Sequence, residues 1–312
     1  MRTIAVHASK GGVGKTTLTV NLAYEIARLG NKVLVIDLDD QANSSLYLGV
    51  NKADELNNAK TLDEFDKILE SFKDRKEIID LLSVDSQSSA FDYKTYIHNS
   101  PFNKYLKLTN SNGSIDVIPS SYRTKYEQDK LTNRAGGSGI TETILNKLLK
   151  KFNDEYDYII MDTSPNLTPV TKNGLFASRY LLIPTQLEYF SAYGVSSVVR
   201  DVKRGVQEEM EGQRAILLGI VPTMTEPLRG RVKTKVNNFI KQLLEKAKLG
   251  TALMPEIKRT KSFSDAAEKQ LPFRVFVDNK RQKSPSEMEA LNQLSNLTTD
   301  IIKRIDVDES RR

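Results

Sequence analysis

The hydrophobic positions at the start of the chain predict a strand, a helix and a second strand. An apolar run covers Thr3–Ala8, and a pattern with apolar residues at three- and four-residue spacing follows over about Lys15–Arg28. Gly30 is placed to end that helix in the left-handed conformation. The next run, Lys32–Asp37, is continuously apolar in its centre, which is typical of a parallel strand covered on both faces. These residues therefore predict one βαβ unit.

The same alternation continues along the chain. We expect further strands at Ile115–Pro119, Tyr156–Asp162, Tyr180–Pro184 and Ala215–Pro222, with helical stretches between most of them. Alternating strands and helices predict an α/β fold, a doubly wound and mostly parallel sheet with helices on both faces.

Residues 51–112 interrupt this pattern. They hold a charged helical stretch over Leu62–Leu82 and then a polar segment, Ser83–Asn112, which we interpret as a helical insertion followed by a loop. Gly136–Gly139 indicates a flexible connection, but no linker divides the chain. We therefore expect a single domain over residues 1–312 with an insertion at about 51–112.

Composition removes several classes of protein. The chain has no cysteine, which excludes disulfides, thiolate zinc sites and the iron–sulfur clusters of reductases and cluster carriers. The two histidines lie far apart in sequence, so a histidine metal site is not expected. No run approaches the roughly 20 apolar residues of a membrane span, and the N-terminus turns polar too soon for a signal peptide. A cytoplasmic protein is the expectation.

A phosphate-binding loop is indicated between the first strand and the first helix. The segment reads Lys10-Gly11-Gly12-Val13-Gly14-Lys15-Thr16-Thr17. Glycines let successive backbone N–H groups turn toward a phosphate, and the helix that begins near Lys15 adds the positive end of its dipole. Lys15 supplies a charge to the β- and γ-phosphates, Thr16 is placed to bind Mg²⁺, and Thr17 to bond a neighbouring phosphate oxygen. The sequence therefore predicts a Mg-ATP site.

The second lysine makes this loop more specific. Ser9 stands where the usual P-loop pattern has its first glycine, and Lys10 precedes Gly11, which gives a deviant Walker A motif. In this the sequence resembles the ParA/MinD family of ATPases. The resemblance implies that Lys10 reaches across a dimer interface to the phosphates of the partner's nucleotide, so that ATP binding produces a homodimer.

Two groups of acids support the phosphate loop. Asp37 and Asp39 follow the second strand, and their alternation places both on the same side. They resemble an acidic segment of the family, which implies that Asp37 supports the magnesium shell and Asp39 orders or activates the attacking water. The family's usual proline is Asp40 here, which loosens the expected turn. Asp162, at the end of an apolar strand, resembles a Walker B aspartate that binds Mg²⁺ through water.

The distribution of charge suggests a polyanionic partner. The net charge is +6, and the segment Arg229–Lys261 holds ten basic residues against two acids. Charge without base readout suits nonspecific DNA, and this segment lies where the family carries such contacts. We expect the main DNA contacts at Arg229, Arg231, Lys258 and Arg259.

The resemblance implies a slow, Mg²⁺-dependent ATP hydrolase that partitions plasmid or chromosome DNA. It would bind the nucleoid as an ATP-dependent dimer and be stimulated by a ParB-like centromere-binding protein. A nucleoid-riding ATPase that positions a protein cargo shares this mechanism and remains an alternative. A MinD-like membrane-cycling regulator is a third possibility, but the acidic tail at Asp306–Glu309 would be repelled by an anionic leaflet.

Overall fold

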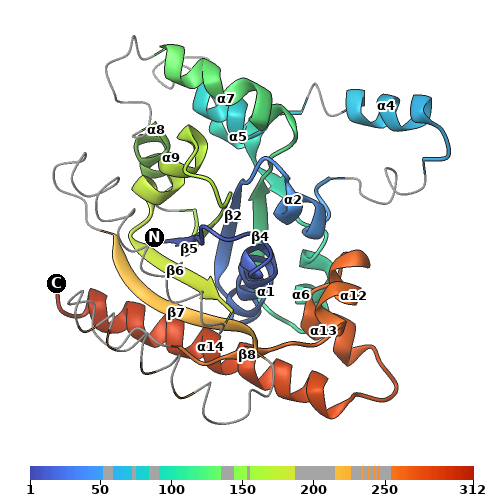
Figure 1. The fold of residues 1–312 in the computed structure, drawn as a ribbon, viewed down its shortest axis with the longest axis vertical. Helices are drawn as coiled ribbons and strands as arrows, with labels where there is room; N and C mark the ends of the chain where they lie inside the picture. The colour runs from blue at the N-terminus through green and yellow to red at the C-terminus, as the bar shows by residue number, and fades with distance from the viewer. Residues whose placement is uncertain are drawn as a thin grey trace.

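The computed structural model describes residues 1–51, 59–71, 75–83, 91–134, 144–152, 155–186, 215–225 and 254–312, together with residues 234, 238, 242 and 245. Its strands are β1 (Arg2–Val6), β2 (Lys32–Leu38), β3 (His98–Asn99), β4 (Ser114–Ile118), β5 (Tyr158–Thr163), β6 (Tyr180–Thr185), β7 (Ile216–Thr225) and β8 (Ile257–Lys258). Within these residues they form an eight-stranded sheet of order β3-β4-β2-β5-β1-β6-β7-β8 (Figure 1). Every neighbouring pair is parallel except β3 with β4. The predicted fold class is confirmed.

Helices cover both faces of this sheet. They are α1 (Lys15–Arg28), α2 (Asn43–Tyr47), α4 (Leu62–Ser71), α5 (Ile78–Ser83), α6 (Asn103–Leu108), α7 (Arg123–Arg134), α8 (Ile144–Leu149), α9 (Pro169–Ala177), α12 (Ser262–Glu268), α13 (Phe273–Asp278) and α14 (Pro285–Glu309). In the part of the chain that the structure describes, short 3₁₀ turns lie at Tyr93–Tyr96 and Lys150–Phe152.

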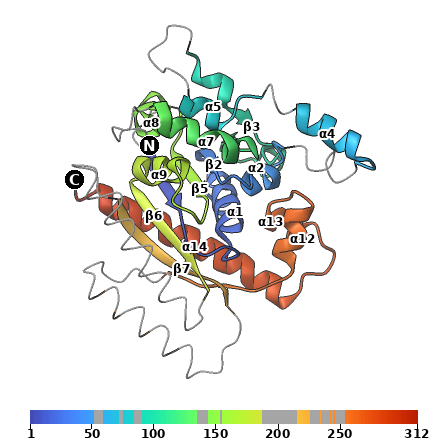
Figure 2. The same cartoon turned by 45° about the horizontal axis from the view of Figure 1, so that its top comes forward.

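The strand β2 shows why the sheet is buried on both sides. Val33 and Val35 pack into a core shared with α1 and α14, while Leu34 and Ile36 pack into a second core shared with α5, α8 and α9 (Figure 2). Successive side chains of a strand point to opposite faces, so a continuously apolar strand serves both cores. The continuous run in the sequence predicted this arrangement correctly.

The expectation for residues 62–82 was wrong in one respect. Instead of one helical stretch, the structure has α4 and α5, and Arg75, Lys76 and Glu77 are not helical. The side chains of Arg75 and Glu77 instead bond to Val50 and Ser121, and these tertiary contacts outweigh helix propensity.

The expectation of a loop over Ser83–Asn112 was also only partly correct. The described part of this segment holds a 3₁₀ turn, β3 and α6. Phe102 and Leu106 are fully buried and fasten α6 to the core. The expected flexible connection at Gly136–Gly139 lies outside the described residues.

The last helix, α14, closes one face of the sheet. Ser284 and Glu287 form a capping box at its start, and the apolar residues on one face, including Leu294 and Ile301, are buried. Near its end, Glu309 accepts hydrogen bonds from the guanidinium of Arg2 at 2.9 and 3.1 Å. The start of β1 is thereby tied to the end of the last helix.

Candidate nucleotide site

The loop between β1 and α1 has the backbone that a phosphate cradle requires. Gly12 and Gly14 adopt φ values of 72° and 84°, in the left-handed region that favours glycine. Gly14 precedes the first turn of α1, which contains no acid, and no side chain of the described residues caps it. The N–H groups of this turn and the positive end of the helix dipole are therefore available to an anion.

Lys15 is the lysine of this cradle. Only 6% of the residue is exposed, and its amino group donates to the carbonyl oxygen of Lys10 at 3.4 Å. Burial lowers the pKa of Lys15, and the negative charges of Asp162 and Asp39 oppose that shift. Lys15 thus lies between the glycine loop and both expected acids.

Asp162 is the polar centre behind the loop. It ends the apolar part of β5 and is fully buried. Its Oδ2 accepts hydrogen bonds from Thr16 Oγ1 at 2.7 Å and from Ser44 Oγ at 2.6 Å. Burial raises the pKa of Asp162, and the hydrogen bonds from Ser44 and Thr16 oppose the shift. The predicted proximity of Thr16 and Asp162 is present in the structure.

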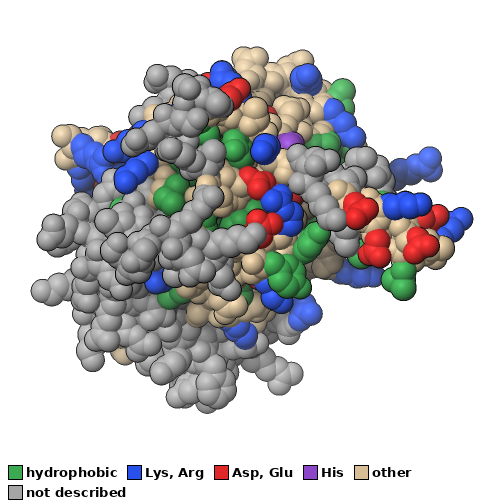
Figure 3. Space-filling model, turned by 90° about the horizontal axis from the view of Figure 1, so that it is seen from above, with side chains coloured by type: hydrophobic (Ala, Val, Ile, Leu, Met, Phe, Trp, Pro, Cys, Tyr) green, Lys and Arg blue, Asp and Glu red, His purple; other side chains and the backbone are tan. Residues whose placement is uncertain are grey.

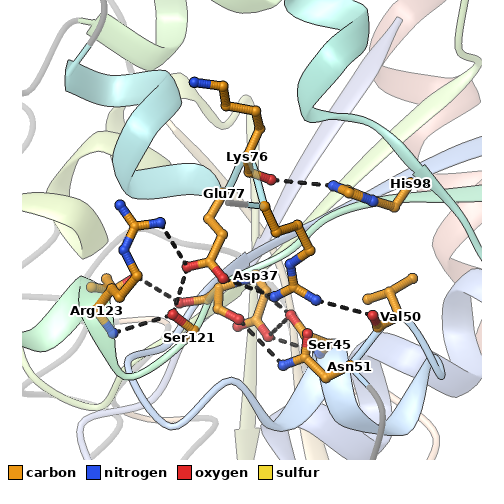
Figure 4. Close-up of polar contacts among 12 residues, drawn as sticks. Asp37, Ser45, Val50, Asn51, Lys76, Glu77, His98, Ser121 and Arg123 are labelled. Carbon is orange, nitrogen blue, oxygen red and sulfur yellow. Dashed lines mark hydrogen bonds and ion pairs between the residues drawn. The ribbon is translucent and has the colours of Figure 1, made fainter. Parts of the chain in front are cut away.

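Asp37 lies opposite Asp162 in the register of the neighbouring strands β2 and β5. It is fully buried, and its Oδ2 accepts from both the backbone N (2.8 Å) and the Oγ (2.6 Å) of Ser45 (Figure 4). Burial first, and the charge of Asp162 second, raise the pKa of Asp37. Two carboxylates that face each other in this way favour a cation between or beside them.

Asp39 lies just beyond β2 and faces the open side of the loop. Its Oδ1 accepts from the backbone N of Gln41 at 3.0 Å, and Ala42 follows in the left-handed conformation with φ 53°. Asp40 was expected to loosen this turn in place of a proline. The turn is instead closed locally by the side chain of Asp39, as in an Asx-turn.

The open side of the loop is a hollow of about 790 Å³. Gly11, Lys15, Thr16 and Asp39 line it on one side, with residues of α2 and α12 on the others. A smaller hollow of about 300 Å³ adjoins it at Gly14, Thr17 and Met224 and is lined by Leu18, Thr223, Ile257 and Phe263 among others. The smaller hollow also contains the basic residues Lys258, Arg259 and Lys261, so positive charge borders the phosphate cradle.

The donor set behind the loop fits magnesium. The hydroxyl of Thr16 and the carboxylates of Asp37 and Asp162 are hard oxygen ligands, which Mg²⁺ prefers, often through its own waters. The hydrogen bond from Thr16 Oγ1 to Asp162 Oδ2 brings this hydroxyl and one of these carboxylates together at one point.

The side chain of Lys10 leaves this cradle. Its amino group donates to Gln186 Oε1 of the same chain at 3.3 Å, and Gln186 Nε2 in turn donates to the carbonyl oxygen of Gly12 at 3.4 Å. The same Nε2 lies 3.3 Å from the sulfur of Met224, a residue in the left-handed conformation at φ 51°. Lys10 is therefore held at the rim and Lys15 inside.

The sequence reasoning missed four residues of this site. Ser44 and Ser45 hold the buried carboxylates, and Gln186 and Met224 line the rim. The serines follow Asp39 on α2, but serines are common at helix starts, so nothing singled them out. Gln186 follows β6 and Met224 is the last but one residue of β7, both at the same edge as the loop, a signal that sheet topology alone supplies.

The expected DNA contacts are only partly described. Arg229 and Arg231 lie outside the described residues. Lys258 lies in β8, and its amino group contacts Glu289 Oε1 at 2.5 Å, so its charge is partly balanced within the chain. Arg259 lines the smaller hollow beside Lys258. Among the described helices, none is long and apolar enough to cross a bilayer.

Comparisons with known proteins show the family to which the sequence is similar. A family model described as an AAA domain matches residues 1–215. The chain is 30% identical over 223 residues to the sporulation initiation inhibitor protein Soj of Bacillus subtilis (strain 168), a match that covers 72% of each protein. It is 31% identical over 203 residues to the chromosome-partitioning ATPase Soj of Treponema pallidum (strain Nichols), covering 65% of this chain and 64% of that protein.

Solved structures share the fold. The ATP complex of a McdA variant from Cyanothece superposes with a TM-score of 0.69 and covers 98% of this chain and 96% of its own. Its sequence is 17% identical, so this likeness concerns the fold alone.

Proposed function

We propose that this chain, which belongs to the ParA/MinD family of ATPases, is a partition ATPase that forms an ATP-dependent dimer on nonspecific DNA. One observation carries the proposal. The phosphate loop bears two lysines, and only Lys15 serves its own cradle, while the amino group of Lys10 lies at the exposed rim beside Gln186. A cation at the mouth of one cradle is placed to neutralise charge in a facing one.

In this proposal the chain binds Mg-ATP as one half of a shared site. Backbone N–H groups of Gly11, Gly12, Val13 and Gly14, with Lys15 and Thr17, hold the phosphates. Thr16 would bind Mg²⁺, and Asp37 and Asp162 would hold its water ligands. Bound magnesium supplies positive charge to the β- and γ-phosphate oxygens.

Hydrolysis is assigned to an attacking water held by Asp39. Asp39 is only 6% exposed, and it lines the hollow together with Lys15. Its carboxylate can therefore accept a hydrogen bond from a water molecule inside a closed site. Because Lys10 acts on the nucleotide of the partner copy, turnover depends on dimerisation and is slow for an isolated chain.

DNA and a ParB-like partner complete the proposal. The basic segment Arg229–Lys261 supports nonspecific DNA binding through phosphates, and nucleoid association follows from it. The similarity to a chromosome-partitioning ATPase supports the segregation of plasmid or chromosome DNA, with a ParB-like centromere-binding protein that stimulates hydrolysis.

The burial of α14 argues against the membrane-cycling alternative. A MinD-like regulator would lay the apolar face of a C-terminal helix on the lipid surface. In this chain Leu294, Leu297 and Ile301 of α14 are at most 2% exposed and pack in the core. The apolar face of α14 is therefore packed against the protein core and does not face the solvent.

The experiment is a DNA-binding assay with random-sequence duplex in the presence of ATP, ADP or no nucleotide, each at 50 and 200 mM salt. We expect binding only with ATP, and a loss of affinity of at least tenfold at the higher salt if several phosphates are contacted. Binding that ignores the nucleotide would contradict the proposal, and binding to anionic liposomes instead of DNA would favour the membrane-cycling alternative.

A further inference from the structure

The helix α4 stands away from the rest of the molecule (Figures 1 and 2). Thr61 caps its start, because Thr61 Oγ1 accepts from the backbone N of Glu64 at 3.1 Å. Leu62 and Phe65 lie one turn apart on one face, and they are 82% and 40% exposed. Two large apolar side chains in water on a capped helix indicate a face that another surface covers.

This face borders the nucleotide site. Phe65 lines the same hollow as Gly11, Lys15 and Thr16. The exposed apolar side of α4 is therefore part of the mouth through which a second molecule would approach the phosphates.

Val50 and Arg75, on either side of the segment that carries α4, take part in hydrogen bonds (Figure 4). The guanidinium of Arg75, which follows α4, donates to the carbonyl oxygen of Val50, which precedes it, at 3.0 Å. Arg75 also bonds Glu77 Oε1 at 2.9 Å, and Glu77 Oε2 accepts from Ser121 Oγ at 2.6 Å. Glu77 is fully buried. A hydrogen bond thus joins Val50, before the segment that carries α4, to Arg75, after it.

Hydrogen bonds also connect these residues to Asp37 in the nucleotide site. Ser45 Oγ donates to Asp37 at 2.6 Å and accepts from the backbone N of Ser120 at 3.0 Å, next to Ser121. The side-chain amide of Asn51 donates to the carbonyl oxygen of Ser120 at 3.4 Å. These hydrogen bonds therefore connect Asn51 and Arg75, which lie on either side of the segment that carries α4, to the buried carboxylate of Asp37.

We propose that the apolar face of α4 at Leu62 and Phe65 is a contact surface for a second copy of this chain. The inference rests on the proposed ATP-dependent dimer. A second copy that brings its Lys10 to the phosphates in this hollow must reach the mouth that Phe65 lines. The phosphate loop offers mainly polar groups, whereas a stable interface needs an apolar centre, and α4 supplies one.

Charge favours the same occupant. Within Leu62–Ser71 four acids stand against one lysine, on a chain of net charge +6 (Figure 3). An acidic helix at the mouth of the site attracts a second copy of a basic chain and offsets the repulsion between two like-charged molecules.

The test compares Leu62→Ser/Phe65→Ser with Leu108→Ser, a matched control that is 79% exposed on α6. Sedimentation with Mg²⁺ and with AMPPNP at a concentration that saturates each variant should show dimerisation weakened about tenfold or more for the double variant and normal dimerisation for the control. A double variant that dimerises like the wild type would overturn the inference. A wild type that stays monomeric would overturn the proposed dimer itself.

Thiol labelling adds a second measurement, because the chain has no cysteine of its own. Maleimide labelling of Leu62→Cys should slow with AMPPNP, and the slowing should increase with protein concentration, while labelling of Leu108→Cys stays constant. Slowing that is independent of protein concentration would mean that α4 closes over its own nucleotide, which contradicts a second copy. Unchanged labelling of Leu62→Cys in a sample that dimerises would contradict it as well.

Discussion

The amino group of Lys10 lies 3.3 Å from Oε1 of Gln186 in the same chain. The other end of that amide bonds Gly12, so Gln186 joins the second lysine of the phosphate loop to the loop's own backbone. A lysine that acts on the partner's nucleotide must first leave this contact. We therefore expect the contact with Gln186 to oppose the movement of Lys10 toward a partner's nucleotide.

Two substitutions of Gln186 are expected to act in opposite directions. Gln186→Ala removes the hydrogen bond between Gln186 and Lys10 and should strengthen ATP-dependent dimerisation about two- to tenfold, since a hydrogen bond contributes about 0.5–1.5 kcal/mol. Gln186→Glu replaces the amide acceptor with a carboxylate, which holds the amino group of Lys10 more strongly, and should therefore weaken dimerisation. Sedimentation with AMPPNP measures both, and shifts of the same sign would show that Gln186 does not restrain Lys10.

Lys10→Ala should separate nucleotide binding from dimerisation. The amino group of Lys10 lies at the rim, while Lys15 lines the hollow, so ATP affinity should change less than about threefold. The ATP-dependent dimer should be lost on size-exclusion chromatography. Lys94→Ala, an exposed lysine far along the chain in the segment before β3, is the control. A dimer retained by Lys10→Ala would refute the action of this lysine on the partner.

Asp39→Ala should bind ATP and dimerise but hydrolyse slowly. The loss of a general base or water-positioning carboxylate costs about a hundredfold or more in turnover. Asp40→Ala is a close control, because Asp40 is a neighbouring acid whose side chain bonds Gln41 rather than lining the hollow. Phosphate release at saturating ATP measures both, and normal turnover in Asp39→Ala would remove Asp39 from the mechanism.

Metal-free protein should lose stability as the pH rises. Burial raises the pKa of Asp37 to about 8 and that of Asp162 to about 6, from a usual value of 3.8. An acid with a raised pKa in the folded state stabilises the fold fully below pH 4, and this contribution is lost as the pH rises toward 8. Urea unfolding in EDTA from pH 5 to pH 8 measures the effect.

Asp37→Asn is the control for this pH dependence. It removes one of the two facing carboxylates, so the stability profile should flatten. Mg-ATP should stabilise the wild type more at pH 8 than at pH 6, because binding to ionised carboxylates needs no proton release. A stability that rises between pH 5 and pH 8 without metal would contradict the assigned direction.

Glu77→Ala should strongly destabilise the protein. Glu77 is fully buried between Arg75, Ser121 and Arg123, so its removal leaves buried positive charge and should cost about 3–5 kcal/mol of unfolding free energy. Glu289→Ala breaks the exposed pair with Lys258 and should cost less than about 1 kcal/mol. Urea denaturation compares them, and equal losses would mean that the buried cluster contributes little.

The central strands and the phosphate loop could be predicted from the sequence because their signals are local. A continuously apolar strand such as β2 and a glycine at each left-handed position of the loop need no knowledge of distant residues. The sequence also placed Asp37 and Asp162 at the ends of strands, and the structure adds that these two strands are neighbours with the two residues in register.

Other features depend on contacts between distant segments. The sequence pattern predicts Arg75 and Glu77 within a helix. Their side chains instead bond to Val50 and Ser121, and the two residues are not helical in the structure. The two-residue strand β8 exists only because β7 extends beside it. Ser45 is indistinguishable from any serine at a helix start until Asp37 is seen beside it.

The bond between Arg2 and Glu309 has a practical consequence for experiments. It brings the first and last elements of the chain together at the amino edge of β1, while the phosphate loop lies at the opposite end of that strand, roughly 15–20 Å away. A fluorescent protein fused at either terminus would therefore point away from the nucleotide mouth. The chain is also suited to circular permutation, because a short linker could join these neighbouring ends and leave the rim intact.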